Sequence, residues 1–122
     1  MPQLTEMDEK VTLFSQLESS GGPVILINTF KVDPAEVEQL LHAWAADAAF
    51  MKRQPGFIST QLHRGIGGSC VFINYAVWES VEAFKRAFFH PEFQETIQKY
   101  PPSAVGSPHL FLTVAVPGIC VA

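Results

Sequence analysis

The stretch that decides the fold is PVILINTFKVDPAEVEQLLHAWAADAAFMKRQPG, residues 23–56. Its first part, residues 24–30, is rich in β-branched and aromatic side chains and predicts a buried strand. Asp33, Pro34 and Glu36 then signal a helix start, since they supply a cap acceptor, a first-turn proline and a glutamate three residues after the cap. An apolar stripe at helical spacing continues to Pro55-Gly56, and it comprises Val37, Leu40, Leu41, Trp44, Ala48 and Met51.

Beyond this stretch the sequence alternates strand and helix signals. A hairpin of two strands and a glycine-rich turn is expected at residues 57–64, 65–69 and 70–78. Ser80 caps an expected helix, His90-Pro91 begins a short further one, and Pro101-Pro102 ends it. HLFLTVAV, residues 109–116, is the expected last strand. The order β-α-β-β-α-β predicts an α+β, ferredoxin-like fold with an antiparallel four-stranded sheet and both main helices on one face.

Both faces of this expected sheet carry apolar side chains. In the first strand Val24 and Leu26 alternate with Ile25 and Ile27, and residues 70–77 show the same pattern. Two helices cover one face only, so the other face needs a second layer, most economically the same face of a second copy. The sequence therefore predicts a homodimer formed through the sheet face.

The composition narrows the class of protein. The chain has 122 residues, the length of one domain, of which 48 % are apolar and 16 % charged. The net charge is −4 and the basic residues are dispersed, so we expect no nucleic-acid partner. No stretch approaches the ~20 apolar residues of a membrane span, and residues 1–22 are too polar for a secretory signal. We therefore expect no membrane partner, a cytoplasmic location, and free thiols at Cys70 and Cys120.

Ser19-Ser20-Gly21-Gly22 is a short segment of small residues typical of flexible turns, and it separates two parts of the chain. We expect residues 1–22 to form an N-terminal appendage and residues 23–122 to form the folded domain. Removal of residues 1–20 is then expected to leave the domain folded.

Two motifs, RQPGF at residues 53–57 and NYAVWESVEAF at residues 74–84, resemble the antibiotic biosynthesis monooxygenase family, whose members are dimeric α/β barrels. One group in that family oxidises phenolic or anthrone-like aromatics with molecular oxygen and no cofactor. It uses an asparagine and a tryptophan four residues apart on the third strand. The resemblance carries these roles to Asn74 and Trp78, whereas Phe84 stands where that group has a tyrosine.

A second group in the family opens haem, and the chain matches it less well. Those enzymes have an asparagine on the first strand, which Asn28 matches, but also a histidine ligand and a second tryptophan. These two positions fall near Ile97 and Ala87 here. Because isoleucine cannot ligate iron, we expect no specific haem ligation. The resemblance to the oxygen-using group implies that no cofactor is needed.

Oxygen chemistry without a cofactor needs a substrate anion, and the protein must stabilise that anion in a water-poor cavity. Asn74 and Trp78 have the same strand parity and carry neutral N–H donors, so together they can bracket a flat aromatic. His90, at the helix break, is a candidate catalytic base. The expected substrate-binding residues are Asn28, Trp44, His63, Phe84 and Tyr100. No histidine pair has metal-ligand spacing, so no metal site is expected.

The leading hypothesis is thus a cofactor-independent monooxygenase acting on an electron-rich small aromatic molecule. The alternative is a non-catalytic dimeric barrel that binds a small apolar ligand, in which Trp78 is a core aromatic and Asn74 is held by a neighbouring backbone group. Haem binding or degradation is the third hypothesis.

Overall fold

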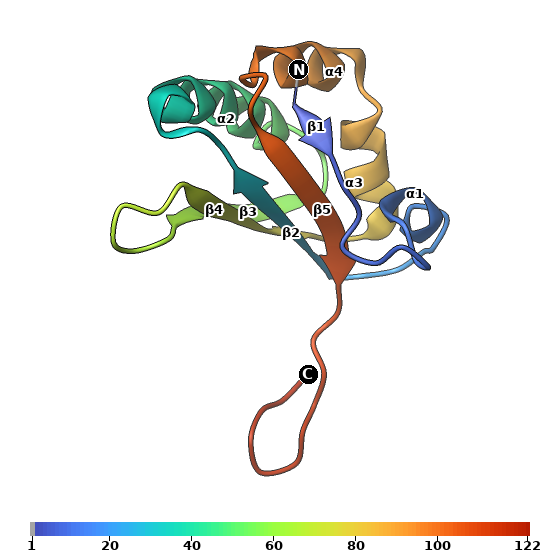
Figure 1. The fold of residues 1–122 in the computed structure, drawn as a ribbon. Helices are drawn as coiled ribbons and strands as arrows, with labels where there is room; N and C mark the ends of the chain where they lie inside the picture. Colours follow the sequence, from blue (N-terminus) through green and yellow to red (C-terminus); the bar gives the residue numbers. More distant parts are fainter. Residues whose placement is uncertain (1) are drawn as a thin grey trace.

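One face of a five-stranded sheet carries three helices in this α+β fold, which a computed structural model describes for residues 2–122 (Figure 1). The strands are β1 (Gln3–Leu4), β2 (Val24–Lys31), β3 (Phe57–Arg64), β4 (Val71–Trp78) and β5 (Val105–Phe111). The helices are α1 (Leu13–Gln16), α2 (Val37–Met51), α3 (Val81–Phe88) and α4 (Pro91–Thr96), with the 3-10 helices η1 (Pro34–Glu36) and η2 (Ile97–Lys99). Helices α2, α3 and α4 lie on the covered face. From β2 onward the ferredoxin-like order is confirmed.

The sheet, ordered β1-β5-β2-β4-β3, has one strand more than the sequence predicts. Gln3 and Leu4 pair in parallel with Val105 and Gly106 of β5. A two-residue strand has no hydrophobic periodicity, because alternation needs a longer run to be visible. The four-strand prediction is therefore one strand short at this edge.

Helix starts follow the predicted signals in one case and depart from them in another. Ser80 caps α3, because its hydroxyl accepts a hydrogen bond from the Ala83 N–H at 3.1 Å. Asp33 makes no side-chain cap bond, and the chain first forms η1, so that α2 begins only at Val37. Short 3-10 turns of this kind are common at the N-termini of α-helices.

The last strand begins four residues and ends five residues earlier than predicted, over Val105–Phe111 instead of 109–116. Its partner β2 begins at Val24, and the last pair between the two strands is Ile25 with Phe111. Residues beyond Phe111 meet no neighbouring strand of their own chain. They form an arm, residues 112–122, that extends away from the body of the protein (Figure 1).

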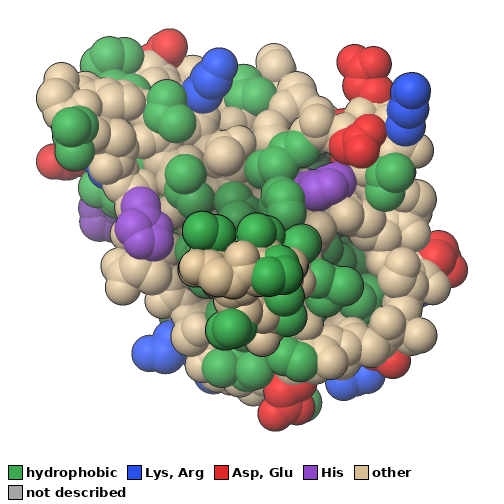
Figure 2. All heavy atoms as spheres, turned by 90° about the horizontal axis from the view of Figure 1, so that it is seen from below, with side chains coloured by type: hydrophobic (Ala, Val, Ile, Leu, Met, Phe, Trp, Pro, Cys, Tyr) green, Lys and Arg blue, Asp and Glu red, His purple; other side chains and the backbone are tan. Residues whose placement is uncertain are grey.

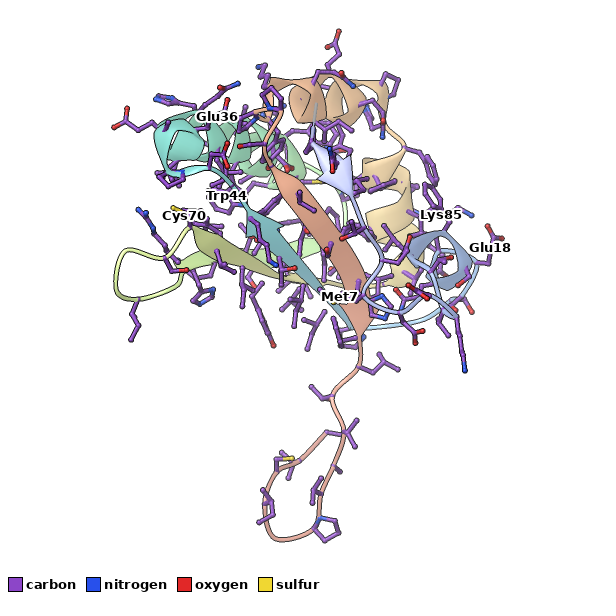
Figure 3. The ribbon with its side chains drawn as sticks, viewed as in Figure 1. Met7, Glu18, Glu36, Trp44, Cys70 and Lys85 are labelled. Atoms are coloured by element: carbon purple, nitrogen blue, oxygen red, sulfur yellow. The ribbon has the colours of Figure 1, made fainter. Side chains whose placement is uncertain are left out.

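Residues before β2 pack against the body of the protein. Leu13 and Leu17 are each 2 % exposed and belong to the same core cluster as Trp78 and Phe84. The Gln16 side chain bonds both the N–H and the carbonyl of Leu110, each at 3.0 Å. Figure 3 shows Glu18 and Lys85 side by side where α1 meets α3, and these two residues form an ion pair at 3.5 Å.

The two faces of the sheet differ in their cover. Phe72, Ala76 and Trp78 of β4 face the helices and are buried, whereas Ile73 and Tyr75 on the opposite face are 39 % and 40 % exposed. Figure 2 shows hydrophobic side chains gathered across this open side. Both faces are therefore apolar, as the sequence pattern predicts. Among residues 2–122, no helix is long and apolar enough to cross a membrane.

Candidate functional site

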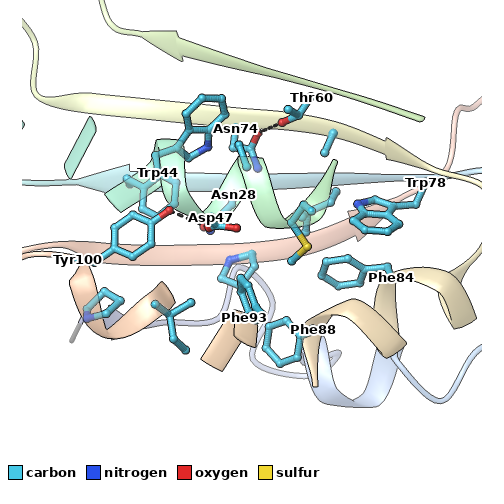
Figure 4. A pocket seen from close by; sticks show the side chains of 18 of the residues that line it. Asn28, Trp44, Asp47, Thr60, Asn74, Trp78, Phe84, Phe88, Phe93 and Tyr100 are labelled. Atoms are coloured by element: carbon cyan, nitrogen blue, oxygen red, sulfur yellow. Dashed lines mark hydrogen bonds between the residues drawn. The ribbon is translucent and has the colours of Figure 1, made fainter. Parts of the chain in front are cut away.

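A pocket lies between the covered face of the sheet and the helices (Figure 4). Its wall is mostly apolar and aromatic, which is typical of sites for small organic ligands. A few polar groups interrupt this wall: Asn28, Trp44, Asp47, Thr60, Asn74, Trp78 and Tyr100. The apolar part comes from the sheet, the helices and the N-terminal segment: Pro2, Leu4, Leu26, Phe30, Ala48, Met51, Phe57, Ala76, Phe84, Phe88, Phe93, Ile97 and Pro108.

Asn28 and Asn74 form a cross-strand pair in the sheet floor of this pocket. They occupy directly opposite positions in the register between β2 and β4. The Asn74 carbonyl oxygen accepts a hydrogen bond from the Thr60 hydroxyl at 2.5 Å, and the Asn28 carbonyl oxygen accepts from the Ser107 N–H at 2.9 Å. Because both oxygens are engaged, the NH₂ groups are the ends left to donate toward a ligand. The pair places two neutral donors side by side.

Trp78, the last residue of β4, closes the pocket on the side away from Tyr100 (Figure 4). The side chain is 1 % exposed. Its ring meets Phe57 at 5.5 Å and Phe84 at 5.7 Å between centroids, both in edge-to-face contact. These geometries stabilise aromatic pairs, so Trp78 is held rigidly as a wall.

Asp47, which is half-buried, and Tyr100, which is buried, form a polar pair on the helix side of the pocket. The Tyr100 hydroxyl donates to Asp47 Oδ2 at 2.8 Å, and its ring stacks on Phe30 at 5.4 Å. Burial raises the pKa of Asp47 from 3.8 to about 6, against the opposing effect of the Tyr100 hydrogen bond. Burial and the adjacent carboxylate raise the pKa of Tyr100 far above its usual range, so the phenol stays protonated and can only donate to Asp47.

Replacing Asp47 with asparagine should stabilise the protein at pH 7 more than at pH 4. In the unfolded wild-type chain this carboxyl ionises near pH 3.8. In the folded wild-type protein, burial keeps it protonated until the pH reaches about 6. Its free energy of unfolding therefore falls over this window by at most about 3 kcal/mol, and the variant escapes that loss. Urea denaturation at both pH values measures the difference. Glu38→Gln, an exposed change on the same helix, is the control and should show no comparable gain.

The two histidines predicted for the site lie elsewhere. His90 caps α4, because its Nδ1 accepts from the Glu92 N–H at 3.0 Å, and its ring packs on Phe50. His63 is exposed on β3, with its Nδ1 3.4 Å from the Ile73 carbonyl oxygen. Neither lines the pocket, whereas the six other predicted site residues do: Asn28, Trp44, Asn74, Trp78, Phe84 and Tyr100.

Sequence reasoning missed Asp47 and Thr60. Asp47 follows Trp44 by three residues on α2 and so shares its side of the helix, a spacing that marks a charge inside an apolar stripe. Thr60 has strand parity with Leu62, on the side of β3 that meets Asn74. Among the residues that the structure describes, no group of three His, Cys, Asp or Glu side chains is placed to hold a metal ion.

The chain is similar to a curated protein and to several solved structures. A deoxynogalonate monooxygenase from Streptomyces nogalater is 40 % identical over 72 residues, which cover 57 % of this chain and 58 % of that protein. The chain thus matches little more than half the length of this curated relative. The solved structure of SnoaB, a cofactor-independent oxygenase from Streptomyces nogalater, superposes with a TM-score of 0.66 and 31 % identity over 78 % of this chain and 96 % of that one.

A second solved structure gives a similar result. A provisionally named monooxygenase from Shewanella loihica PV-4 superposes with a TM-score of 0.65 and 35 % identity, covering 79 % of this chain and 98 % of that chain. Residues 23–99 match the family described as antibiotic biosynthesis monooxygenase. That range contains β2 to η2, and with them every pocket element except the N-terminal segment, Tyr100 and β5. Over this range in sequence, and in its fold, the chain belongs to the antibiotic biosynthesis monooxygenase family.

Proposed function

We propose that this protein is a cofactor-independent monooxygenase that oxidises a phenolic or anthrone-like aromatic with molecular oxygen. The observation that carries the proposal is the Asn28 and Asn74 pair, two amide donors with engaged carbonyl oxygens in an apolar, aromatic-walled pocket. The names of two similar proteins, a deoxynogalonate monooxygenase and a cofactor-independent oxygenase, support the same class of reaction.

The pocket has the donors and the flat aromatic surfaces that this oxidation requires. Ground-state oxygen is a triplet and reacts slowly with closed-shell organic molecules, so the substrate must first become an electron-rich phenolate or enolate. Donors that are fixed in place stabilise such an oxyanion far better in a water-excluded site than in water. The two amides are placed to bind the substrate oxygen, while Trp44, Trp78 and Phe84 supply flat surfaces for its rings.

Oxygen consumption tests this proposal. Metal-free protein should consume one O₂ per anthrone and yield anthraquinone and water, and chelators should not inhibit the reaction. Product identification by mass spectrometry after incubation in ¹⁸O₂ should place one labelled oxygen in the quinone. A panel of anthrones and polycyclic phenols that bind the protein without any oxygen uptake would favour a non-catalytic ligand-binding barrel instead.

We further propose that the protein works as a homodimer joined through the open face of the sheet. On that face Ile73 and Tyr75 remain exposed in the single chain, and contiguous exposed apolar surface of this kind is typical of interfaces. The arm adds to it, because Leu112, Val114, Ile119 and Val121 are between 70 % and 87 % exposed. Apolar side chains this exposed on an extended arm are well suited to pack on a second copy.

Analytical ultracentrifugation at micromolar concentration should therefore give about twice the chain mass of 13.5 kDa. A chain ending at Phe111 should dissociate at concentrations where the full chain stays dimeric, because it loses the apolar arm. Thr113→Ala, a polar position on the same arm, is the control and should leave the dimer intact. A soluble monomer at these concentrations would contradict the proposal.

A further inference from the structure

The proposed reaction begins with removal of a proton, and the amide pair cannot perform that step. Asn28 and Asn74 stabilise an anion once it exists, but a neutral amide is no base at physiological pH. No histidine is among the described residues that line the pocket. Asp47 and Tyr100 are the only ionisable side chains among them. A base must therefore be sought in this pair.

The geometry points to Asp47 as the catalytic base that takes the proton from the substrate, an inference that rests on the proposed oxygenase function. Asp47 projects from α2 one turn after Trp44, and Figure 4 shows it in the same part of the pocket as Tyr100, Trp44 and Asn28. The Tyr100 hydroxyl donates a hydrogen bond to one carboxylate oxygen, Oδ2, at 2.8 Å. The carboxylate is thus oriented within the pocket by a fixed donor.

The protonation behaviour of this pair suits the role. With its pKa raised to about 6, Asp47 is ionised at neutral pH and yet is a stronger base than an exposed aspartate. Tyr100 stays protonated, so it positions the carboxylate and does not compete for the substrate proton. From the strands and helices around the pocket, Tyr100 is the only other titratable group among the described lining residues that faces Asp47.

A single carboxylate, that of Asp47, can carry out every proton transfer of the reaction. Asp47 takes one proton from the CH₂ of an anthrone, the C–H bond breaks, and the electron pair stays on the substrate as an enolate. One electron passes from the enolate to O₂, and the two radicals join in a C–O bond to give a peroxide anion.

The Asp47 carboxylic acid then returns its proton to the terminal peroxide oxygen. In the last step the carboxylate takes the second C–H proton while the O–O bond breaks and a carbonyl forms. The departing hydroxide receives this proton from Asp47 and leaves as water. In sum, one CH₂ and one O₂ give one C=O and one H₂O.

Proton removal can be measured without oxygen, which separates this inference from the oxygenase proposal. Anthrone is incubated with protein under argon in D₂O, and NMR follows exchange of its CH₂ hydrogens. The wild-type protein should accelerate exchange, and Asp47→Asn should lose that acceleration by ~100-fold or more, the usual contribution of a general base. Asp47→Glu, which keeps a carboxylate, should retain part of it, and Glu38→Gln should match the wild type.

Each outcome decides between the two proposals. Exchange that depends on Asp47 without later oxygen uptake would support the base and overturn the oxygenase function. Oxygen uptake with equal exchange in wild type and Asp47→Asn would overturn the base and leave the function standing. No acceleration of exchange by the wild-type protein would overturn the base as well.

A second readout tests Tyr100 as the positioning residue. The exchange rate should fall on the acid side with an apparent pKa near 6. Tyr100→Phe removes the hydrogen bond that lowers the pKa of Asp47, so this acid limb should move to higher pH. A loss of rate without any movement of the limb would overturn the positioning role.

Discussion

Asn74→Ala should slow oxygen uptake with anthrone by ~100-fold or more while leaving the protein folded. Removal of one fixed donor to an oxyanion typically costs ~2.7–4 kcal/mol of transition-state stabilisation in a water-excluded site. Asn74 meets both conditions, because Thr60 fixes its carbonyl oxygen and the pocket around it is apolar. Initial rates in an oxygen electrode at saturating anthrone measure the effect on kcat.

Four further variants sharpen this test. Asn28→Ala should have a comparable effect, and the double variant should fall short of the product of the two losses, since both amides serve one oxyanion. Thr60→Val frees the Asn74 oxygen and should have a smaller effect on rate. Gln39→Ala removes an exposed amide from α2, outside the pocket, and should change nothing. Uptake by Asn74→Ala at the wild-type rate would contradict the assignment of the donor.

Trp78 carries a weaker expectation for catalysis than the amides do. Its ring is packed between Phe57 and Phe84, so Trp78→Phe removes the indole N–H while keeping an aromatic wall. The size of the rate loss in that variant, relative to the loss in Asn74→Ala, reports how much the N–H contributes.

Much of the fold follows from local signals, because hydrophobic periodicity and cap residues act within a few positions of the chain. The strand at residues 24–30, the hairpin and the Ser80 cap all appear where these signals place them. The last strand differs because its position depends on a partner far away in sequence. The last strand ends where its partner β2 begins, and the local sequence HLFLTVAV contains no information about that position.

Pro108 shows why the start of β5 was also missed. A proline inside a strand normally argues against the assignment, since it has no N–H to donate. Here the Ser107 N–H donates toward Asn28 on β2, so Pro108, next along the strand, turns its nitrogen to the opposite edge. β1 has ended there, and no donor is required. Register, which local sequence does not specify, decides whether the proline is tolerated.

The part of the site that depends on local signals could also be predicted from the sequence. Strand parity puts Asn74 and Trp78 on one face, and the structure places both in the pocket wall. Asp47, in contrast, lies within an apolar stripe that also fits simple core packing. Its importance depends on Tyr100, which is 53 residues away in sequence and reaches it only through the tertiary fold.

Deletion of residues 1–20 should strongly destabilise the protein, which is the opposite of the tolerance that composition suggests. The segment places Leu13 and Leu17 in the main core cluster, where each is 2 % exposed. Replacing a buried leucine by alanine typically costs about 2–5 kcal/mol, and a domain of this size has only about 5–15 kcal/mol of stability. Loss of both side chains together with the Gln16 bonds to Leu110 approaches that total.

Single substitutions show whether the buried leucines, and not merely the presence of the segment, stabilise the protein. Leu17→Ala should lower the free energy of unfolding in urea by at least about 2 kcal/mol. Val11→Ala, an exposed position two residues before α1, should change it by less than about 0.5 kcal/mol. Because Pro2 and Leu4 line the pocket, the truncated chain should also bind anthrone more weakly wherever it stays folded. A truncated protein that melts within 2 °C or so of the full chain and binds anthrone equally well would instead establish residues 1–22 as an appendage.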